Sequence, residues 1–149
     1  MPSPLTLEEV RAHADALIRA LNARDFDAIA GSEYFDEDRS EFRSAIATSE
    51  GEVYRGIDGL RHWAANVDET WDDFRIEIVD LQRADPDRTL PVLHATGRAK
   101  ASGVPLDLQT AQVWTWDERG VMIRNDSFTD PREAYEAAGV PYEPSTRSV

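Results

Sequence analysis

Apolar residues recur at helical spacing in two long stretches of the chain and predict two helices. The first covers residues 7–21 and follows Thr6 and Glu9, which form a capping box that satisfies backbone donors at the helix start. The second covers residues 58–71, with Asp58 as its N-cap. Both carry one apolar stripe, so both are expected to pack that stripe against a core.

Two shorter helices are predicted from their end signals. A helix of about one turn follows Asp25 and ends at Gly31, where glycine favours a helix stop. A last helix begins at Asp130, has Pro131 in the first helical position and ends at Gly139. The first of these belongs to an N-terminal helical part, and the second closes the chain.

The region between the helices alternates between apolar and polar residues, which predicts strands. Strands are expected over residues 74–81, 90–101, 106–116 and 121–127, and Glu41–Arg43 is a weaker candidate. Helices that precede a run of antiparallel strands define the α+β class. The predicted architecture is a cone-shaped barrel, in which the N-terminal helices close a curved, mostly antiparallel sheet.

The last two strands form a hairpin that predicts the wall of a cavity. Residues 117–120 make its turn, and Gly120 can take the positive φ that such a turn needs. The expected cross-strand pairs are Trp116 with Val121, Trp114 with Ile123, Gln112 with Asn125 and Thr110 with Ser127. These side chains share one face of the hairpin. On both strands the pairs next to the turn are apolar and the pairs farther from it are polar. The alternatives are a cavity wall and an ordinary half-solvated face, and one β-bulge would break this register.

Length and composition favour one domain spanning residues 1–149, with a core over about 5–140 and a frayed tail at 141–149. The chain has no cysteine, which excludes disulfides and thiolate chemistry. Neither a signal peptide nor a membrane-spanning run is recognisable. We therefore expect a soluble, cytoplasmic protein that does not act on membranes.

The formal net charge of −13 argues against a nucleic-acid partner, because a polyphosphate surface would be repelled. The three histidines lie in separate elements without metal-ligand spacing, so no metal and no cofactor are expected. His94 shares a strand face with Arg98 and Lys100, and this face is expected to point outward.

Five stretches resemble the nuclear transport factor 2-like superfamily, and within it the polyketide-cyclase-like (SnoaL-like) proteins. They are RDFDAI at 24–29, YRGIDGLRHW at 54–63, ASGV at 101–104, VWTW at 113–116 and FTDPREAYEAAG at 128–139. The resemblance covers nearly all of the chain from Leu7 to Gly139. It implies a cone-shaped α+β fold that encloses a pocket, and a homodimer formed through the sheet.

The resemblance also implies positions for catalytic groups, and this sequence departs from the pattern at each of them. Ser127 stands where cyclases and epoxide hydrolases carry an Asp, and Asn125 where cyclases carry a His. The isomerases' Tyr, general-base Asp and protonated Asp fall on Leu17, Arg43 and Gln112. Proton abstraction next to a carbonyl needs a base, and these side chains do not supply one.

Two functions remain open on this basis. The first is binding of a small hydrophobic molecule with carbonyl or hydroxyl groups, in a pocket where Thr110, Gln112, Asn125 and Ser127 form a polar rim above Trp63 and Trp114. The second is an isomerase, cyclase or hydrolase that uses Glu41 or Tyr34 as a non-standard base. In the isomerase-like register Glu41 and Arg43 would face inward together, where Arg43 could keep Glu41 ionised or bind an anionic ligand. An exposed ion pair is the alternative.

Overall fold

The computed structural model describes residues 5–43, 53–128 and 130–142. The loop expected around residues 49–51 and the tail from residue 143 onward lie outside these ranges. The helices are α1 (Leu7–Asn22), α2 (Phe26–Ala30), α3 (Gly56–Thr70) and α4 (Pro131–Ala138). The strands are β1 (Glu41–Arg43), β2 (Tyr54–Arg55), β3 (Trp71–Asp85), β4 (Arg88–Ala99), β5 (Pro105–Trp116) and β6 (Met122–Phe128).

The strands form one curved sheet in the order β2-β1-β6-β5-β4-β3. Every pair is antiparallel except β1 with β6, which is parallel. Among the described strands, β2 and β3 are the two edges and do not pair with each other. The predicted α+β class is confirmed, and the sheet is open rather than a closed barrel.

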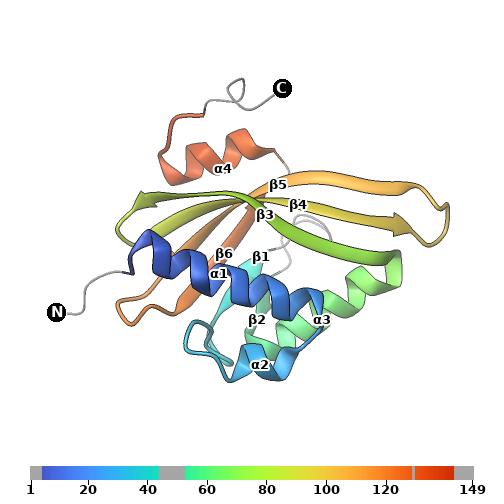
Figure 1. The fold of residues 1–149 in the computed structure, drawn as a ribbon, viewed down its shortest axis with the longest axis horizontal. Helices are drawn as coiled ribbons and strands as arrows, with labels where there is room; N and C mark the ends of the chain where they lie inside the picture. Colours follow the sequence, from blue (N-terminus) through green and yellow to red (C-terminus); the bar gives the residue numbers. More distant parts are fainter. Residues whose placement is uncertain (1–4, 44–52, 129, 143–149) are drawn as a thin grey trace.

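Three helices cover one face of the sheet and the fourth covers the other, as Figure 1 shows. The larger core cluster lies between the sheet and α1–α3, and includes Leu17, Trp63 and Trp114. A smaller cluster joins β4 and β5 to α4, where Ala134 is fully buried. The predicted order of helices, sheet and final helix therefore becomes a three-layer arrangement. No described helix is both long and apolar enough to cross a membrane.

The end signals of the helices are mostly confirmed. Thr6 and Glu9 form the predicted capping box, with the Glu9 backbone N–H 3.1 Å from the Thr6 hydroxyl. Asp25 and Asp130 cap α2 and α4 through their side chains. The predicted start of α3 at Asp58 is wrong.

The helix α3 begins two residues earlier than expected, at a glycine with positive φ. Gly56 has φ +66, and its N–H donates to the Ser40 carbonyl over 2.6 Å. This conformation, which glycine adopts without strain, turns β2 directly into the helix. Asp58 lies in the first turn instead, where its charge complements the helix dipole. Trp71, predicted as the helix end, begins β3.

The hairpin of β5 and β6 has a different register from the one predicted. Trp114 pairs with Asn125 and Gln112 with Ser127, so the partners differ by two residues from the prediction. The turn contributes one residue of this shift, because Trp116 pairs with Met122 instead of Val121, and a bulge between Thr115 and Trp116 adds the second. Because side chains alternate with a period of two, Asn125 and Ser127 still face the helices. In the predicted register Met122 alternates with Val121 and Ile123 and would point to the outer face, but it is buried in the main core.

Candidate functional site

A cavity lies between the helical layer and the inner face of the sheet. It leaves about 60 Å³ for the centres of water-sized molecules. One water needs about 10–15 Å³ of such space, so the cavity has room for a small organic molecule. The apolar residues that line it are Leu17, Ile18, Leu21, Phe35, Phe42, Leu60, Trp63, Ile76, Leu93, Ala95, Trp114 and Met122. The polar residues that line it are Arg43, Thr110, Gln112, Asn125 and Ser127.

The structure brings together the site residues predicted from the sequence, with one exception. Trp63, Thr110, Gln112, Trp114, Asn125, Ser127 and Arg43 all line the cavity, and Glu41 does not. They come from α3, β5, β6 and β1, and their ligand-binding role stays a prediction.

Glu41 lies on the strand face opposite to the one expected. In the short strand β1 it is Phe42 that is buried and pairs with the cavity residue Asn125. Glu41 forms an ion pair with Arg55 at 3.1 Å instead of entering the cavity. The expectation of an inward Glu41 is therefore corrected, since strand alternation sends it to the other face.

Arg43 lies at the edge of the cavity and not in its interior. Its side chain is 42% exposed and forms an ion pair with Asp126 at 3.1 Å. Asp126 also accepts from Arg124 at 2.8 Å. The charge of Arg43 is thus engaged on the outer side of the strand, and the wall inside is neutral.

Hydrogen bonds fix the polar part of the wall. The Trp114 indole N–H donates to the Gln112 Oε1 over 2.7 Å. This bond holds the Gln112 carboxamide with its oxygen toward Trp114, which leaves the amide N–H groups as the free side of that carboxamide. The Asn125 Oδ1 is buried and has no hydrogen-bond partner among the described residues. A buried acceptor without a partner is costly, and its burial also closes this oxygen off from the space of the cavity.

The loop between α2 and β1 carries Phe35 into the cavity wall and is fastened to β6. The Met122 N–H donates to the Tyr34 carbonyl, and the Ser40 hydroxyl donates to the Met122 carbonyl over 2.5 Å. Ser40 Oγ also accepts from the Asp36 N–H at 2.9 Å. These bonds fix the position of the loop, and with it Phe35, relative to β6.

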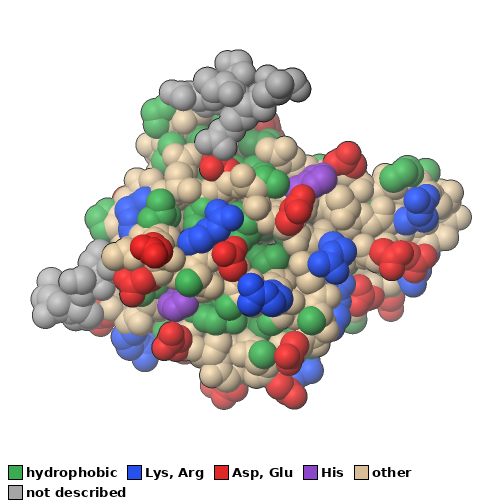
Figure 2. Space-filling view, viewed as in Figure 1, with side chains coloured by type: hydrophobic (Ala, Val, Ile, Leu, Met, Phe, Trp, Pro, Cys, Tyr) green, Lys and Arg blue, Asp and Glu red, His purple; other side chains and the backbone are tan. Residues whose placement is uncertain are grey.

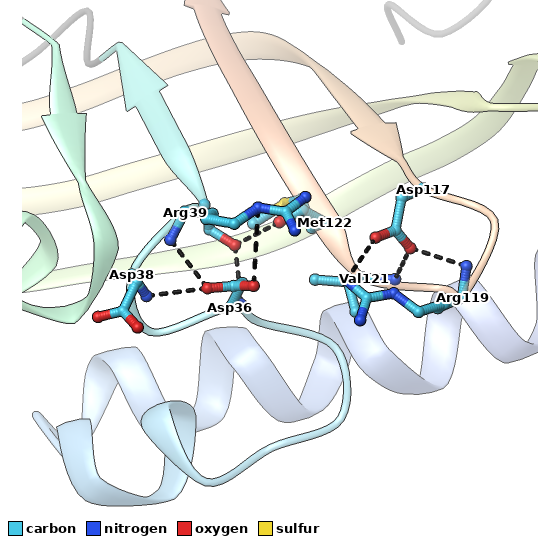
Figure 3. A network of polar contacts seen from close by, with 8 residues as sticks. Asp36, Asp38, Arg39, Asp117, Arg119, Val121 and Met122 are labelled. Atoms are coloured by element: carbon cyan, nitrogen blue, oxygen red, sulfur yellow. Dashed lines mark hydrogen bonds and ion pairs between the residues drawn. The ribbon is translucent and has the colours of Figure 1, made fainter.

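Two neighbouring turns flank this attachment, as Figure 3 shows. The Asp36 carboxylate accepts from the N–H groups of Asp38 and Arg39, which lowers its pKa. Asp117 accepts in the same way from the N–H groups of Arg119 and Val121. Both carboxylates serve turn geometry rather than the cavity.

The ionisable groups of interest lie outside the cavity. None of the described lining residues is Asp, Glu, His or Tyr. Burial raises the pKa of Tyr34, so its phenolate is a poor candidate for a base. His94 bonds Asp107 at 2.5 Å and Glu77 at 3.3 Å, and these carboxylates raise its pKa. Its neighbours Leu93 and Ala95 line the cavity, so His94 points to the opposite face.

Several wall residues were not predicted as site residues. Met122 was missed because the bulge that turns it inward has no sequence signature. Leu93 and Ala95 could have been found, because they alternate with the outward His94. Phe42 could also have been found, because it is the one apolar residue between two charged ones.

The structure is an α+β fold in which a curved sheet and the helices above it enclose an apolar cavity. Comparison with known sequences gives the family of the chain. The SnoaL-like domain matches residues 14–124, so the chain belongs to the SnoaL-like family. No curated protein matches the sequence significantly.

Solved structures share the fold at low sequence identity. One is a hypothetical protein with a ketosteroid isomerase-like fold from Catenulispora acidiphila DSM 44928, in complex with trimethylamine. It is 15% identical over 88% of this chain and 96% of the other, with a TM-score of 0.63. RV0760c from Mycobacterium tuberculosis, in complex with estradiol-17beta-hemisuccinate, is 11% identical over 77% and 88%, with a TM-score of 0.57. The epoxide hydrolase/cyclase-like enzyme SalBIII is 21% identical over 81% and 91%, with a TM-score of 0.60.

Proposed function

We propose that this protein binds a small hydrophobic molecule carrying carbonyl or hydroxyl groups in the cavity beneath the helices. The observation that carries the proposal is the composition of the wall. Apolar side chains surround a few neutral hydrogen-bonding groups, which is the usual make-up of a small-molecule site.

Binding is favoured over catalysis by the neutral lining of the cavity. Isomerisation, aldol cyclisation and epoxide hydrolysis need an acid or base within reach of the substrate. The described wall has Thr110, Gln112, Asn125 and Ser127, but neither a carboxylate nor an imidazole. Glu41, the base proposed for the catalytic alternative, is held by Arg55 on the other face.

The solved relatives support a ligand site in this fold without naming the ligand of this chain. Two of them were solved with small molecules, trimethylamine and estradiol-17beta-hemisuccinate. The third is an enzyme with a role in pyran ring formation. We extend to this chain only the use of the cavity for a small molecule.

The test measures, by ligand-observed NMR, whether benzene and phenol bind to the native chain and to the variant Ala95→Leu. Ala95 lies in the cavity wall and is 1% exposed, so a leucine there would occupy cavity space. Ala101→Leu, in the exposed turn between β4 and β5, is the matched control. Binding that the control keeps and Ala95→Leu loses supports the proposal. If neither probe binds the native chain, a cavity ligand is excluded.

We also propose that the chain acts as a homodimer formed through the outer face of the sheet, in the cytoplasm. The helix α4 covers only part of that face, over β4 and β5. His94 and Asp107 lie on the part beyond it. Light scattering of the native chain and of Asp107→Arg tests the contact. A native mass of two chains that the variant halves is expected, and a native mass of one chain contradicts it.

A further inference from the structure

A second hollow lies beside the cavity, along the edge of the sheet. It is an open groove between the C-terminal half of α1 and the strands β3 and β4, with about 460 Å³ for the centres of water-sized molecules. Figure 2 shows charged side chains of both signs over α1 and the neighbouring strands, with hydrophobic side chains between them. Ile18 and Ile76 line the groove and also line the cavity. These two residues therefore form a partition between the groove and the cavity.

The partition is apolar, whereas the rest of the groove is mostly polar. Ile18 and Ile76 are 9% and 7% exposed, so both are buried where the two hollows meet. Neither side chain can form a hydrogen bond, and both are held by packing alone. Ile78 also lines the groove, and the remaining residues that line it are polar or charged: Asp15, Arg19, Asn22, Arg75, Glu77, His94 and Thr96. The route from the groove into the cavity therefore passes two aliphatic side chains.

Asn22 fixes the backbone on both sides of the partition. Its Nδ2 donates to the Ile76 carbonyl over 2.8 Å, and its Oδ1 accepts from the Ile76 N–H at 2.9 Å. Because β3 is an edge strand, this carboxamide takes the backbone groups that a neighbouring strand would otherwise bind. Asn22 lies four residues after Ile18, so both project from the same side of α1. One carboxamide thereby holds the helix turn that carries Ile18 against Ile76.

We propose that the partition is a gate through which small neutral molecules pass between the groove and the cavity. The gate opens when Ile18 or Ile76 changes rotamer, because such a change breaks no hydrogen bond. The Asn22 bonds keep the helix and the strand in place while the side chains move. A charged molecule would lose its hydration at this apolar passage, so the gate excludes ions. This inference rests on the proposed function, since it gives the route to the same cavity.

Xenon exchange tests the gate, because apolar cavities bind xenon whatever their natural ligand is. Xenon NMR on the folded protein measures the rate at which the gas enters and leaves the cavity. Ile18→Ala shortens one side chain of the partition. Leu17→Ala is the matched control, because Leu17 is 7% exposed and lines the cavity but is not among the described residues of the groove. Both substitutions enlarge the cavity, and only the first widens the passage.

We expect Ile18→Ala to exchange xenon about tenfold faster than Leu17→Ala, which corresponds to a barrier lower by about 1.4 kcal/mol. Ile18→Val and Leu17→Val are the milder pair if an alanine variant does not fold, and the first is again expected to exchange faster. Equal exchange rates within the folded pair overturn the gate and leave the cavity proposal standing. If xenon does not bind to the native chain, the cavity proposal and the gate are both overturned.

Discussion

Replacing Ser40 by alanine tests whether the loop before β1 is attached to the sheet as described. Ser40 is 1% exposed, and its hydroxyl contacts two backbone groups from different segments. It accepts from the Asp36 N–H at 2.9 Å and donates to the Met122 carbonyl at 2.5 Å. The carbonyl belongs to β6, so the substitution removes one of the bonds that attach the loop to this strand, while the bond from the Met122 N–H to the Tyr34 carbonyl remains.

The expected loss of stability follows from those two bonds. Each intramolecular hydrogen bond contributes about 0.5–1.5 kcal/mol, and a buried group left without a partner costs about 1–3 kcal/mol. We therefore expect Ser40→Ala to lower the free energy of unfolding by about 2–3 kcal/mol. For a chain of this length the Tm would fall by about 5–10 °C.

Urea unfolding followed by circular dichroism measures the effect, with Ser102→Ala as the control. Ser102 also accepts a backbone N–H, that of Val104 at 3.3 Å, but in an exposed turn. Its replacement should stay within about 0.5 kcal/mol of the native chain. Equal stabilities of the two variants would refute the view that Ser40 fastens the loop to β6.

Three further outcomes are expected. Gly56→Ala should destabilise the protein strongly, because φ is +66 and the new Cβ would lie 2.3 Å from the Glu37 carbonyl oxygen. Gly103 also has a positive φ but has open space around it, so Gly103→Ala should lower the stability less. Thermal unfolding that gives Gly103→Ala the lower Tm of the two variants would contradict this prediction. Hydrogen bonding to Asp107 raises the pKa of His94 in the folded protein. The contribution of His94 to folding stability is therefore complete below its unfolded pKa of about 6.5, and it is lost as the pH rises through the folded pKa. The native chain should therefore exceed His94→Gln in stability by more at low pH than at high pH, and the two differences should be within about 1 kcal/mol of each other. A difference in urea midpoint that does not change with pH would contradict this prediction. Thr89→Val should remove the buried bond from the Trp116 indole to Thr89, 3.0 Å long, and cost about 1–3 kcal/mol, measured as a shift of the urea midpoint.

The sequence predicted the helices well because their ends carry local chemical signals. Thr6 with Glu9, and Asp130 with Pro131, satisfy backbone groups within a few residues. The start of α3 was mistaken because its cause is not local. Gly56 turns the chain where its N–H meets the Ser40 carbonyl, sixteen residues earlier in the chain.

The cavity wall was predictable as far as strand alternation decides it. Beyond the bulge the hairpin register was wrong by two residues, and an even shift keeps these side chains on their face, so Gln112 and Asn125 stayed inside. The bulge between Thr115 and Trp116 moved Met122 inward, and nothing in the local sequence marks it. Tertiary pairing decided that detail.

The strand β1 shows which of two lines of reasoning holds when they disagree. The residue pattern of Glu41, Phe42 and Arg43 puts the apolar residue inside, whereas the isomerase-like register puts the charged ones there. The structure follows the pattern, since Phe42 is 8% exposed and Glu41 is paired with Arg55. Burial of a charge needs a partner in the cavity, and none of the described wall residues offers a free counter-charge.

The neutral wall also determines how this cavity can discriminate between ligands. Arg43 is the ionisable residue of the described wall, and a guanidinium stays charged throughout the neutral pH range. Selectivity therefore rests on shape and on the direction of hydrogen bonds. That direction is set by the Trp114 indole, which holds the Gln112 oxygen at 2.7 Å. Trp114 is 1% exposed and is fixed by the core around it. The aromatic packing of the sheet and the polarity presented to a ligand therefore depend on the same side chain.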